Sequence, residues 1–279
     1  MNRIASGIVF LCLSSLLPGA VAEDNAALKA RLGRGLTDRP DFQFPTDRNE
    51  LDKALDTNDY AFLLRRDQDL KKSDEVLLFM NWLKYRSLTG GGYVVNKMYV
   101  GDLWRMGDSL LKAGMESGER LKQAAVYQAT YTFLLTVADA PECEDPSAPN
   151  NRSQETLTQF RPIFLFGQAM PAEQREIAAR SALQLERTIA PLRENDDALC
   201  RGGADETFET MQALKNSGKM PEGKSMPGYY GKTILVPSNG QYKPKFAAPA
   251  DWKPRRDELR RNNLPAIAAA LLAPKETKN

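Results

Sequence analysis

Residues 95–138 read VNKMYVGDLWRMGDSLLKAGMESGERLKQAAVYQATYTFLLTVA, and this stretch decides the fold class. Its first half carries apolar residues at helical spacing, which places one stripe on one helix face: Val95, Tyr99, Leu103, Met106 and Leu110. Gly114 ends this helix. The second half predicts another long helix, from about Glu116 to Ala138.

The same period extends outward on both sides. Asp47 and Glu50 resemble a capping box, Ser73 opens a helix that stops at Thr89, and Pro171 opens one that carries a further apolar stripe. A last helix is predicted over about residues 205–215, and residues 141–151 are predicted to be a loop. We therefore expect an all-α multi-helix bundle over residues 23–217.

The composition changes at Gly218. Residues 218–254 contain five glycines and six prolines, which favour irregular structure. We predict an extended, basic, Pro/Gly-rich C-terminal arm over residues 218–279 that ends in short helices. The sequence of this arm is compatible with one short β-hairpin formed by residues 233–236 and 241–246.

The N-terminus has the three parts of a cleavable export signal. Arg3 supplies a positive charge, residues 8–17 form a short apolar core, and Ala20-Val21-Ala22 is an A-x-A cleavage site. The apolar run is too short to span a membrane, which needs roughly 20 residues. We expect residues 1–22 to be a signal peptide cut after Ala22, and the mature protein to work in a bacterial periplasm.

Cysteine usage agrees with an oxidising compartment. Cys12 lies in the signal, which leaves Cys143 and Cys200 as an even pair. Three acidic residues surround Cys143 and would raise the pKa of a free thiol there. The sequence therefore predicts a structural Cys143–Cys200 disulfide rather than a redox site.

Charge is unevenly distributed along the chain. Residues 219–279 hold 12 Lys and Arg against 5 Asp and Glu, a net charge of +7, whereas residues 23–218 carry −6. The near-neutral total argues against nucleic acid or a bulk membrane surface as the main partner. The basic arm is suited either to an acidic surface on another protein or to its own acidic body.

The chain contains no histidine. This removes the usual general base near pH 7, the usual zinc ligand and every Ser-His or Cys-His pair. No sequence pattern indicates a cofactor or a metal site, and none identifies catalytic residues. An enzyme is therefore the less favoured class.

Two sequence patterns match catalytic motifs but lack the structural context that those motifs require. Residues 218–225, GKMPEGKS, match the P-loop pattern, but no buried strand precedes them and no helix can follow. Ser109 and Lys112 match the S-x-x-K pattern of serine acyl-enzymes without the partner motifs of that class. Carboxylates alone can cleave glycosides, and Asp102 is the candidate that interrupts an apolar run. The alternative for Asp102 is an ion pair with Arg105 or Arg86.

Candidate partner-binding residues fall in two groups. Glu194, Asp196 and Asp197 form an acidic cluster near Cys200, opposite a second acidic cluster near Cys143. These carboxylates could be solvated loops, a site for a basic partner, or a calcium site. Tyr229, Tyr230 and Lys232 lie in a Gly/Pro-rich loop, where exposed tyrosines suit either recognition of a partner or attachment of the arm to its own body.

Three function classes remain open. The first is a periplasmic binding or inhibitory protein that acts on another protein, such as an immunity protein against a toxic envelope-targeting hydrolase. The second is a structural or accessory component of an envelope or secretion assembly. The third is a His-free enzyme that acts on peptidoglycan.

Overall fold

A computed structural model describes residues 24–70, 72–193, 195–219, 224–225, 232–233 and 241–274. These residues are mainly helical, which confirms the predicted all-α class. The α-helices are α1 (Asn25–Thr37), α2 (Arg48–Asp56), α3 (Tyr60–Gln68), α4 (Ser73–Leu88), α5 (Tyr93–Lys112), α6 (Ser117–Ala138), α7 (Ser147–Gln159), α8 (Arg161–Ala169), α9 (Ala172–Ile189), α10 (Ala204–Asn216), α11 (Pro249–Asn262) and α12 (Leu264–Leu271). The 3₁₀-helices are η2 (Ala140–Glu142) and η3 (Ala190–Leu192), and two-residue strands β1 (Lys224–Ser225) and β2 (Lys232–Thr233) pair antiparallel.

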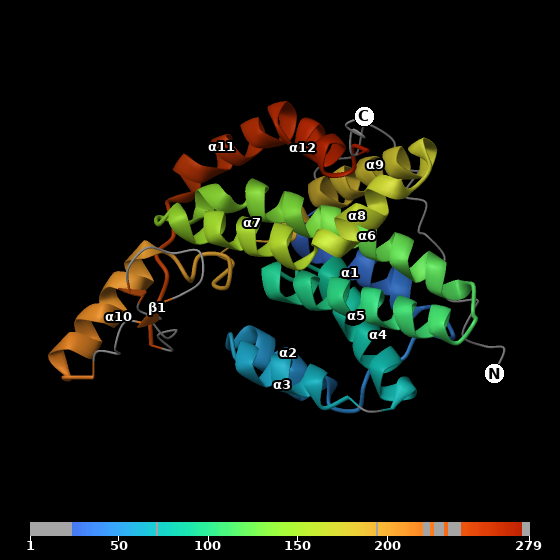
Figure 1. The fold of residues 1–279 in the computed structure, drawn as a ribbon, viewed down its shortest axis with the longest axis horizontal. Helices are drawn as coiled ribbons and strands as arrows, with labels where there is room; N and C mark the ends of the chain where they lie inside the picture. Colours follow the sequence, from blue (N-terminus) through green and yellow to red (C-terminus); the bar gives the residue numbers. More distant parts are fainter. Residues whose placement is uncertain are drawn as a thin grey trace.

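Helices α5 and α6 lie side by side at the centre of the bundle (Figure 1). They are the two helices that residues 95–138 predict. Helix α6 is buried on nearly every side, and its buried threonines are accommodated because their hydroxyls donate to carbonyls of their own helix, as Thr130 does to Val126 O at 2.9 Å. No helix in the described part of the chain is long and apolar enough to cross a membrane.

Two glycines allow the central helices to approach closely. A Cβ on Gly118 of α6 would lie 2.6 Å from the carbonyl oxygen of Gly107 on α5, and a Cβ on Gly107 would lie 3.1 Å from the carbonyl oxygen of Gly118. Side chains at these positions would force the helices apart. The close α5–α6 contact therefore depends on residues that apolar periodicity does not reveal.

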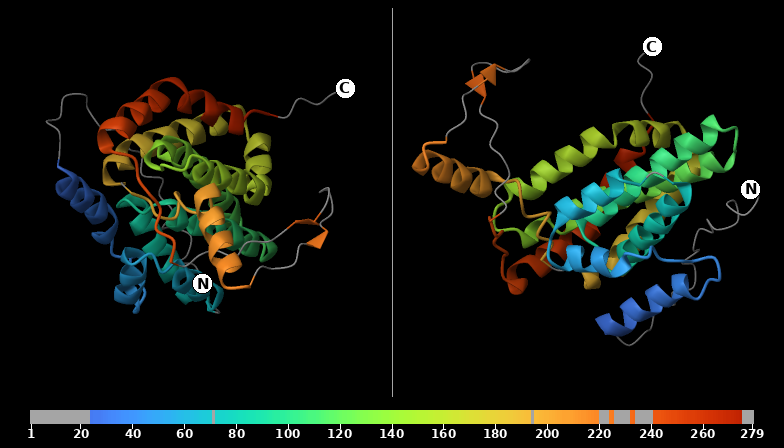
Figure 2. Two further views of the ribbon diagram at one scale, coloured as in Figure 1. Left: turned by 90° about the vertical axis from the view of Figure 1, so that its left-hand side faces the viewer. Right: turned by 90° about the horizontal axis from the view of Figure 1, so that it is seen from below.

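Further helices cover this pair on several sides (Figures 1 and 2). Helices α2 and α3 pack with α4 and α5 around Trp82 and Phe79, both fully buried. On the other side of α6, helices α9 and α12 enclose Tyr131, Leu185 and Leu264. Helix α10 stands away from the bundle at one end.

The predicted loop over residues 141–151 is wrong in its second half, because α7 begins at Ser147. The Asp145 carboxylate accepts hydrogen bonds from the Ser147 backbone N–H at 2.9 Å and from the Ser147 hydroxyl at 2.5 Å. Pro149 then fits the first helical turn, where its missing N–H has no partner to lose. An acidic, Pro-rich stretch is here a helix start.

The predicted hairpin of residues 233–236 with 241–246 is not confirmed. Residues 234–240 lie outside the described residues, and Phe246 pairs instead with Cys143. The Glu144 N–H donates to Lys245 O at 3.1 Å, and the Ala247 N–H donates to Glu142 O at 2.8 Å. The disulfide segment therefore supplies the backbone partners that a hairpin would have needed.

A buried charge cluster joins the C-terminal helices to the rest of the bundle. Its members, three carboxylates and three guanidinium groups, are Asp139, Glu142, Glu186, Arg193, Arg256 and Arg260. Arg193 lies 2.7 Å from Asp139 and 3.0 Å from Glu186, and all three side chains are almost fully buried. From α11, Arg260 reaches Glu186 at 2.9 Å.

The second α11 arginine completes this buried charge cluster. Arg256 lies 3.2 Å from Glu142 and 3.6 Å from Asp139, and its guanidinium lies over the ring of the buried Trp252 at 4.2 Å. Helix α11, within the predicted basic arm, is therefore in direct contact with the acidic body at these residues, while the extended arm itself is not confirmed. The pairing uses arginines, which suit buried multidentate contacts better than lysines do.

We expect Gly118→Ala to lower the free energy of unfolding by about 1–3 kcal/mol, because the added Cβ overpacks the α5–α6 contact. Gly101→Ala is the matched control, since a Cβ at Gly101 meets no atom within 4 Å. Alanine there should stabilise α5 by about 0.5–1 kcal/mol. Denaturant unfolding of both variants measures the difference, and equal effects would contradict the close approach.

Candidate functional site

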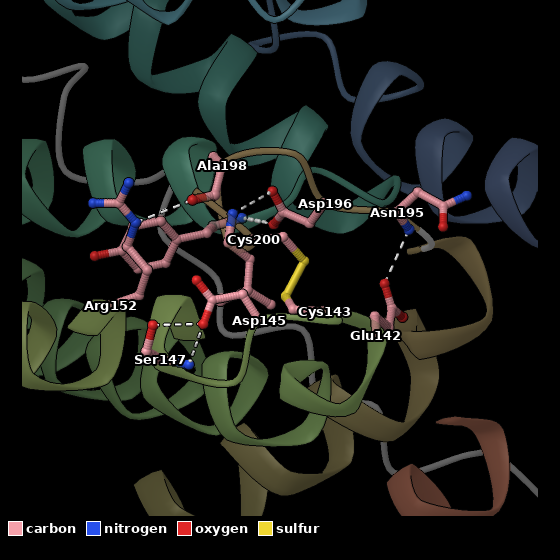
Figure 3. The surroundings of a disulfide bond; sticks show 11 residues. Glu142, Cys143, Asp145, Ser147, Arg152, Asn195, Asp196, Ala198 and Cys200 are labelled. Carbon is pink, nitrogen blue, oxygen red and sulfur yellow. Dashed lines mark hydrogen bonds between the residues drawn. A yellow bond between two sulfur atoms is a disulfide. The ribbon is translucent and has the colours of Figure 1, made fainter. Parts of the chain in front are cut away.

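The predicted cysteine pair is bonded in the structure. Cys143 and Cys200 form a disulfide with a Cα–Cα distance of 5.2 Å across a sequence separation of 57 residues. Figure 3 shows the carboxylates of Glu142, Asp145 and Asp196 around it. The two acidic clusters that the sequence places beside the cysteines are thus brought together.

These carboxylates are used inside the fold. Asp196 accepts a hydrogen bond from the Tyr93 N–H at 2.5 Å, at the start of α5, and another from the Leu199 N–H at 3.2 Å. Asp145 accepts from the Asp205 N–H at 3.0 Å, at the start of α10. The positive end of a helix dipole stabilises a carboxylate in each case, so repulsion between the clusters is relieved by helix N-termini.

Glu142 connects the disulfide to the buried charge cluster. Its carboxylate accepts from the Asn195 N–H at 2.9 Å and pairs with Arg256. Burial, with a contribution from nearby Asp139, raises the pKa of Glu142 to about 8. Glu142, next to Cys143, therefore contacts both α11 and the loop that follows η3.

The described part of the chain contains a cleft of about 710 Å³. Helices α3, α5, α7 and α10 and the loop of residues 198–202 form its walls. Its apolar lining is Leu64, Val94, Met98 and Phe160, and its polar lining includes Tyr60, Asp67, Tyr93, Lys97, Arg105, Arg152, Glu155, Arg201 and Glu206. Volume and mixed lining are typical of ligand sites.

Glu155 lines the cleft from α7 and receives several donors. Lys97 forms a short ion pair with it, and the Arg152 guanidinium lies 2.9 Å away. The Tyr93 hydroxyl donates at 3.2 Å and the Gln159 amide at 3.1 Å. Burial opposes ionisation of Glu155, but Lys97 and Arg152 outweigh it and lower the pKa of this carboxyl group.

Arg152 connects Glu155 to the loop of residues 198–202, because its Nε also donates to Ala198 O at 3.0 Å (Figure 3). Arg201, on the same loop, lies 3.2 Å from Glu206 and 3.8 Å from Asp197. One wall of the cleft is therefore fixed by the segment that the disulfide holds.

The other wall carries a second arginine between two carboxylates. Arg105 lies 2.7 Å from Asp67 on α3 and forms a short ion pair with Asp102 on its own helix. This confirms the predicted Asp102–Arg105 pair. Asp102 itself is 1% exposed, and its Oδ2 has no hydrogen-bond partner among the described residues. Burial, followed by the nearby Asp67 charge, raises the pKa of Asp102 to about 7.

A second hollow is an apolar groove of about 630 Å³ between α6, α7, α8 and α12. Phe133, Leu157 and Ile267 line it, with Arg161 and Gln168 as its polar residues. It contains no group able to transfer a proton at neutral pH. The cleft therefore remains the better candidate for a functional site.

The look-alike motifs have no catalytic geometry in the described residues. The Ser109 hydroxyl donates to Arg105 O at 2.9 Å within its own helix rather than to Lys112. Of the P-loop pattern, Lys224 and Ser225 lie in strand β1 and not at the start of a helix. Both patterns are therefore explained by local structure.

The predicted partner-binding residues are only partly described. Asp196 is half-buried at the start of α5, and Asp197 pairs with Arg201, which lines the cleft. Tyr229, Tyr230 and Glu194 lie outside the described residues, and only the backbone of Lys232 is described, in β2. A role in partner binding stays a prediction for all six.

Sequence analysis did not identify the middle of the cleft. Arg152, Glu155 and Gln159 share one face of α7, at spacings of three and four residues, and this polar stripe was the available signal. Because residues 141–151 were predicted to be a loop, the sequence analysis did not place a helix start there. Lys97 and Tyr93 stand four residues apart on α5, but nothing in the sequence links them to α7.

Within the described residues, no group of three His, Cys, Asp or Glu side chains could hold a metal ion, so the calcium alternative has no support there. Comparisons of the chain with protein-family models, with curated proteins and with solved structures found no match. The site's chemistry therefore has to be inferred from its own residues.

We expect Cys143→Ser to lower the free energy of unfolding by about 4 kcal/mol, since the bond closes a long loop in the unfolded chain. The double variant with Cys200→Ser should cost no more than the single one. Thiol titration of denatured, unreduced protein that lacks residues 1–22, and so lacks Cys12, should find no free thiol, and two reactive thiols would contradict the bond.

The pH dependence of stability should identify Asp102. Its pKa is higher in the folded protein than in the unfolded chain, so the folded protein binds the extra proton and loses stability as pH rises from about 4 towards 7. Asp102→Asn should remove this loss, which makes the variant gain about 2–4 kcal/mol relative to the parent between pH 4.5 and pH 8. Denaturant unfolding at both pH values measures it. Asp108→Asn, on the same helix but 40% exposed, is the control, and an equal gain there would refute the assignment.

Proposed function

We propose that the protein is exported to a bacterial periplasm by a signal peptide over residues 1–22 that is cut after Ala22. The charged start, short apolar core and A-x-A site support the signal. The Cys143–Cys200 disulfide suits an oxidising compartment.

We further propose that it acts by binding another protein, which inserts a segment into the cleft between α3, α5, α7 and α10. The observation that carries this proposal is the fixed arrangement of opposite charges above an apolar floor. Lys97, Arg105, Arg152 and Arg201 are each held by a carboxylate, so little side-chain order has to be gained on binding. Such preorganised polar groups over apolar surface favour recognition.

Exposed apolar side chains near the cleft add to this support. Leu64, which lines the cleft from α3, is 47% exposed. Phe208 does not line the cleft but is 62% exposed on α10, a helix that contributes Glu206, Thr207 and Thr210 to the lining. Exposed large apolar residues beside a cleft are typical contacts for a partner protein.

Among binding functions, an inhibitory protein fits best, such as an immunity protein that neutralises a toxic envelope-targeting hydrolase. A structural or accessory role in an envelope or secretion assembly is the alternative. In either case, Tyr229, Tyr230 and Lys232 remain candidates for a second contact, and Asp197 for a contact at the rim beside Arg201.

A His-free peptidoglycan enzyme is less well supported. The carboxylate with the most suitable acidity for proton transfer is Asp102, but its Oδ2 is fully buried and Arg105 occupies its Oδ1. A general acid has to reach the atom it protonates. Asp102 is therefore better explained as a structural group behind the cleft wall.

Site-specific photo-crosslinking tests the binding proposal. A photoreactive side chain at Leu64 should give a discrete adduct in cells that export the protein, because this position faces the cleft. The same side chain at Ile177, 46% exposed on α9, is the matched control and should not give that adduct. One stoichiometric partner supports an inhibitor, and several partners support an assembly component. No adduct at Leu64, or the same adduct at both positions, would refute binding through the cleft.

A further inference from the structure

The part of the cleft between α5 and α7 has an excess of positive charge. Two cations, Lys97 and Arg152, share one carboxylate, that of Glu155. Each of the three side chains is 27% exposed, so this group lies partly within reach of a ligand and is partly shielded from water. In such surroundings an uncompensated charge attracts an anion more strongly than it would at an open surface.

The hydrogen bonds of Glu155 show why it does not satisfy both cations. Its Oε1 accepts from Lys97 and from the Gln159 amide, and its Oε2 accepts from Arg152 and from the Tyr93 hydroxyl. Four donors fill the acceptor positions of one carboxylate. The Lys97 ammonium has three N–H donors and uses one of them in the described structure, which leaves donors for an incoming group.

The flanking parts of the cleft differ in charge. At one wall Arg105 lies between Asp67 and Asp102, and at the other wall Arg201 lies between Asp197 and Glu206. Neither arginine has positive charge in excess of its carboxylates. An anion is therefore favoured beside Lys97 and Arg152 and disfavoured beside Arg105 and Arg201.

Building on the proposed function, we infer that the cleft recognises one carboxylate side chain of the partner, held by Lys97 and Arg152. Residues next to that aspartate or glutamate are apolar, to cover the floor at Met98 and Phe160, or basic, to face the carboxylates of the walls. A run of acidic residues does not suit this pattern, because its outer charges would meet Asp67 and Glu206. Two neighbouring carboxylates on the partner should therefore bind more weakly than one.

Short capped peptides test the charge pattern without knowledge of the partner. One peptide carries a single glutamate between leucines, a second carries glutamine in its place, and a third carries three consecutive glutamates. Titration of the ¹⁵N-labelled protein, followed by amide chemical shifts, measures even weak affinities and places them on the structure. The glutamate peptide should bind about fivefold more tightly than either of the others, as expected for a partly exposed ion pair.

Two substitutions in the cleft should act in opposite directions. Lys97→Met should remove the preference for glutamate over glutamine. Glu155→Gln should strengthen binding of the glutamate peptide about fivefold and leave the glutamine peptide unchanged, because it releases both cations. Lys122→Met is the control, since Lys122 pairs with Asp108 at 2.6 Å and does not line the cleft.

Amide spectra of the free variants establish that each is folded, and raised salt should reduce the glutamate preference in the parent. Equal affinity for glutamate and glutamine peptides, weaker binding to Glu155→Gln, or no shifts at the cleft would each overturn the inference. A cleft that still crosslinks a partner through Leu64 would then keep the proposed function and reject only the carboxylate.

Discussion

Burial of Arg193 and Arg256, with the partly buried Arg260, against three buried carboxylates is the constraint on which the arrangement of the bundle depends. A single ionised group taken out of water costs several kcal/mol, and a pair recovers this only when its geometry and hydrogen bonds are good. Arg193 satisfies this requirement through Asp139 from the end of α6 and Glu186 from α9. From α11, Arg256 reaches Asp139 and Glu142, and Arg260 reaches Glu186. The buried charge cluster therefore joins the end of α6, η2, α9 and α11.

A short series of contacts connects the buried charge cluster to the cleft. Glu142 belongs to the buried charge cluster and precedes Cys143, and the disulfide then fixes the loop that carries Ala198 and Arg201. Arg152 binds that loop at Ala198 O and Glu155 in the cleft. The buried charge cluster and the disulfide therefore position this wall of the cleft. A rigid support of this kind is what a preorganised binding site requires.

Local patterns made part of this structure predictable. The spacing of apolar residues predicted α5, α6 and α9, cysteine parity predicted the disulfide, and the three-residue separation of Asp102 and Arg105 predicted their pair. The opposite charges of body and arm indicated a contact between them, though not its residues. Periodicity relates positions within one element, whereas Arg256 and Glu142 stand 114 residues apart and meet only in the fold. For the same reason the cleft could not be identified from the sequence. Lys97 and Glu155 come from separate helices, and no residue spacing relates the two positions.

The position of α12 determines how late in synthesis the chain can complete its core. Leu264, Ala268 and Leu272 fill apolar surface that α6 and α9 would otherwise leave open to water. A chain synthesised from its N-terminus cannot close this core until about residue 272 has left the ribosome. Contacts between residues so distant in sequence form slowly. Under the export proposed above, transport can begin from the N-terminus while the C-terminal residues are still being made, because the core is incomplete until α12 has been synthesised.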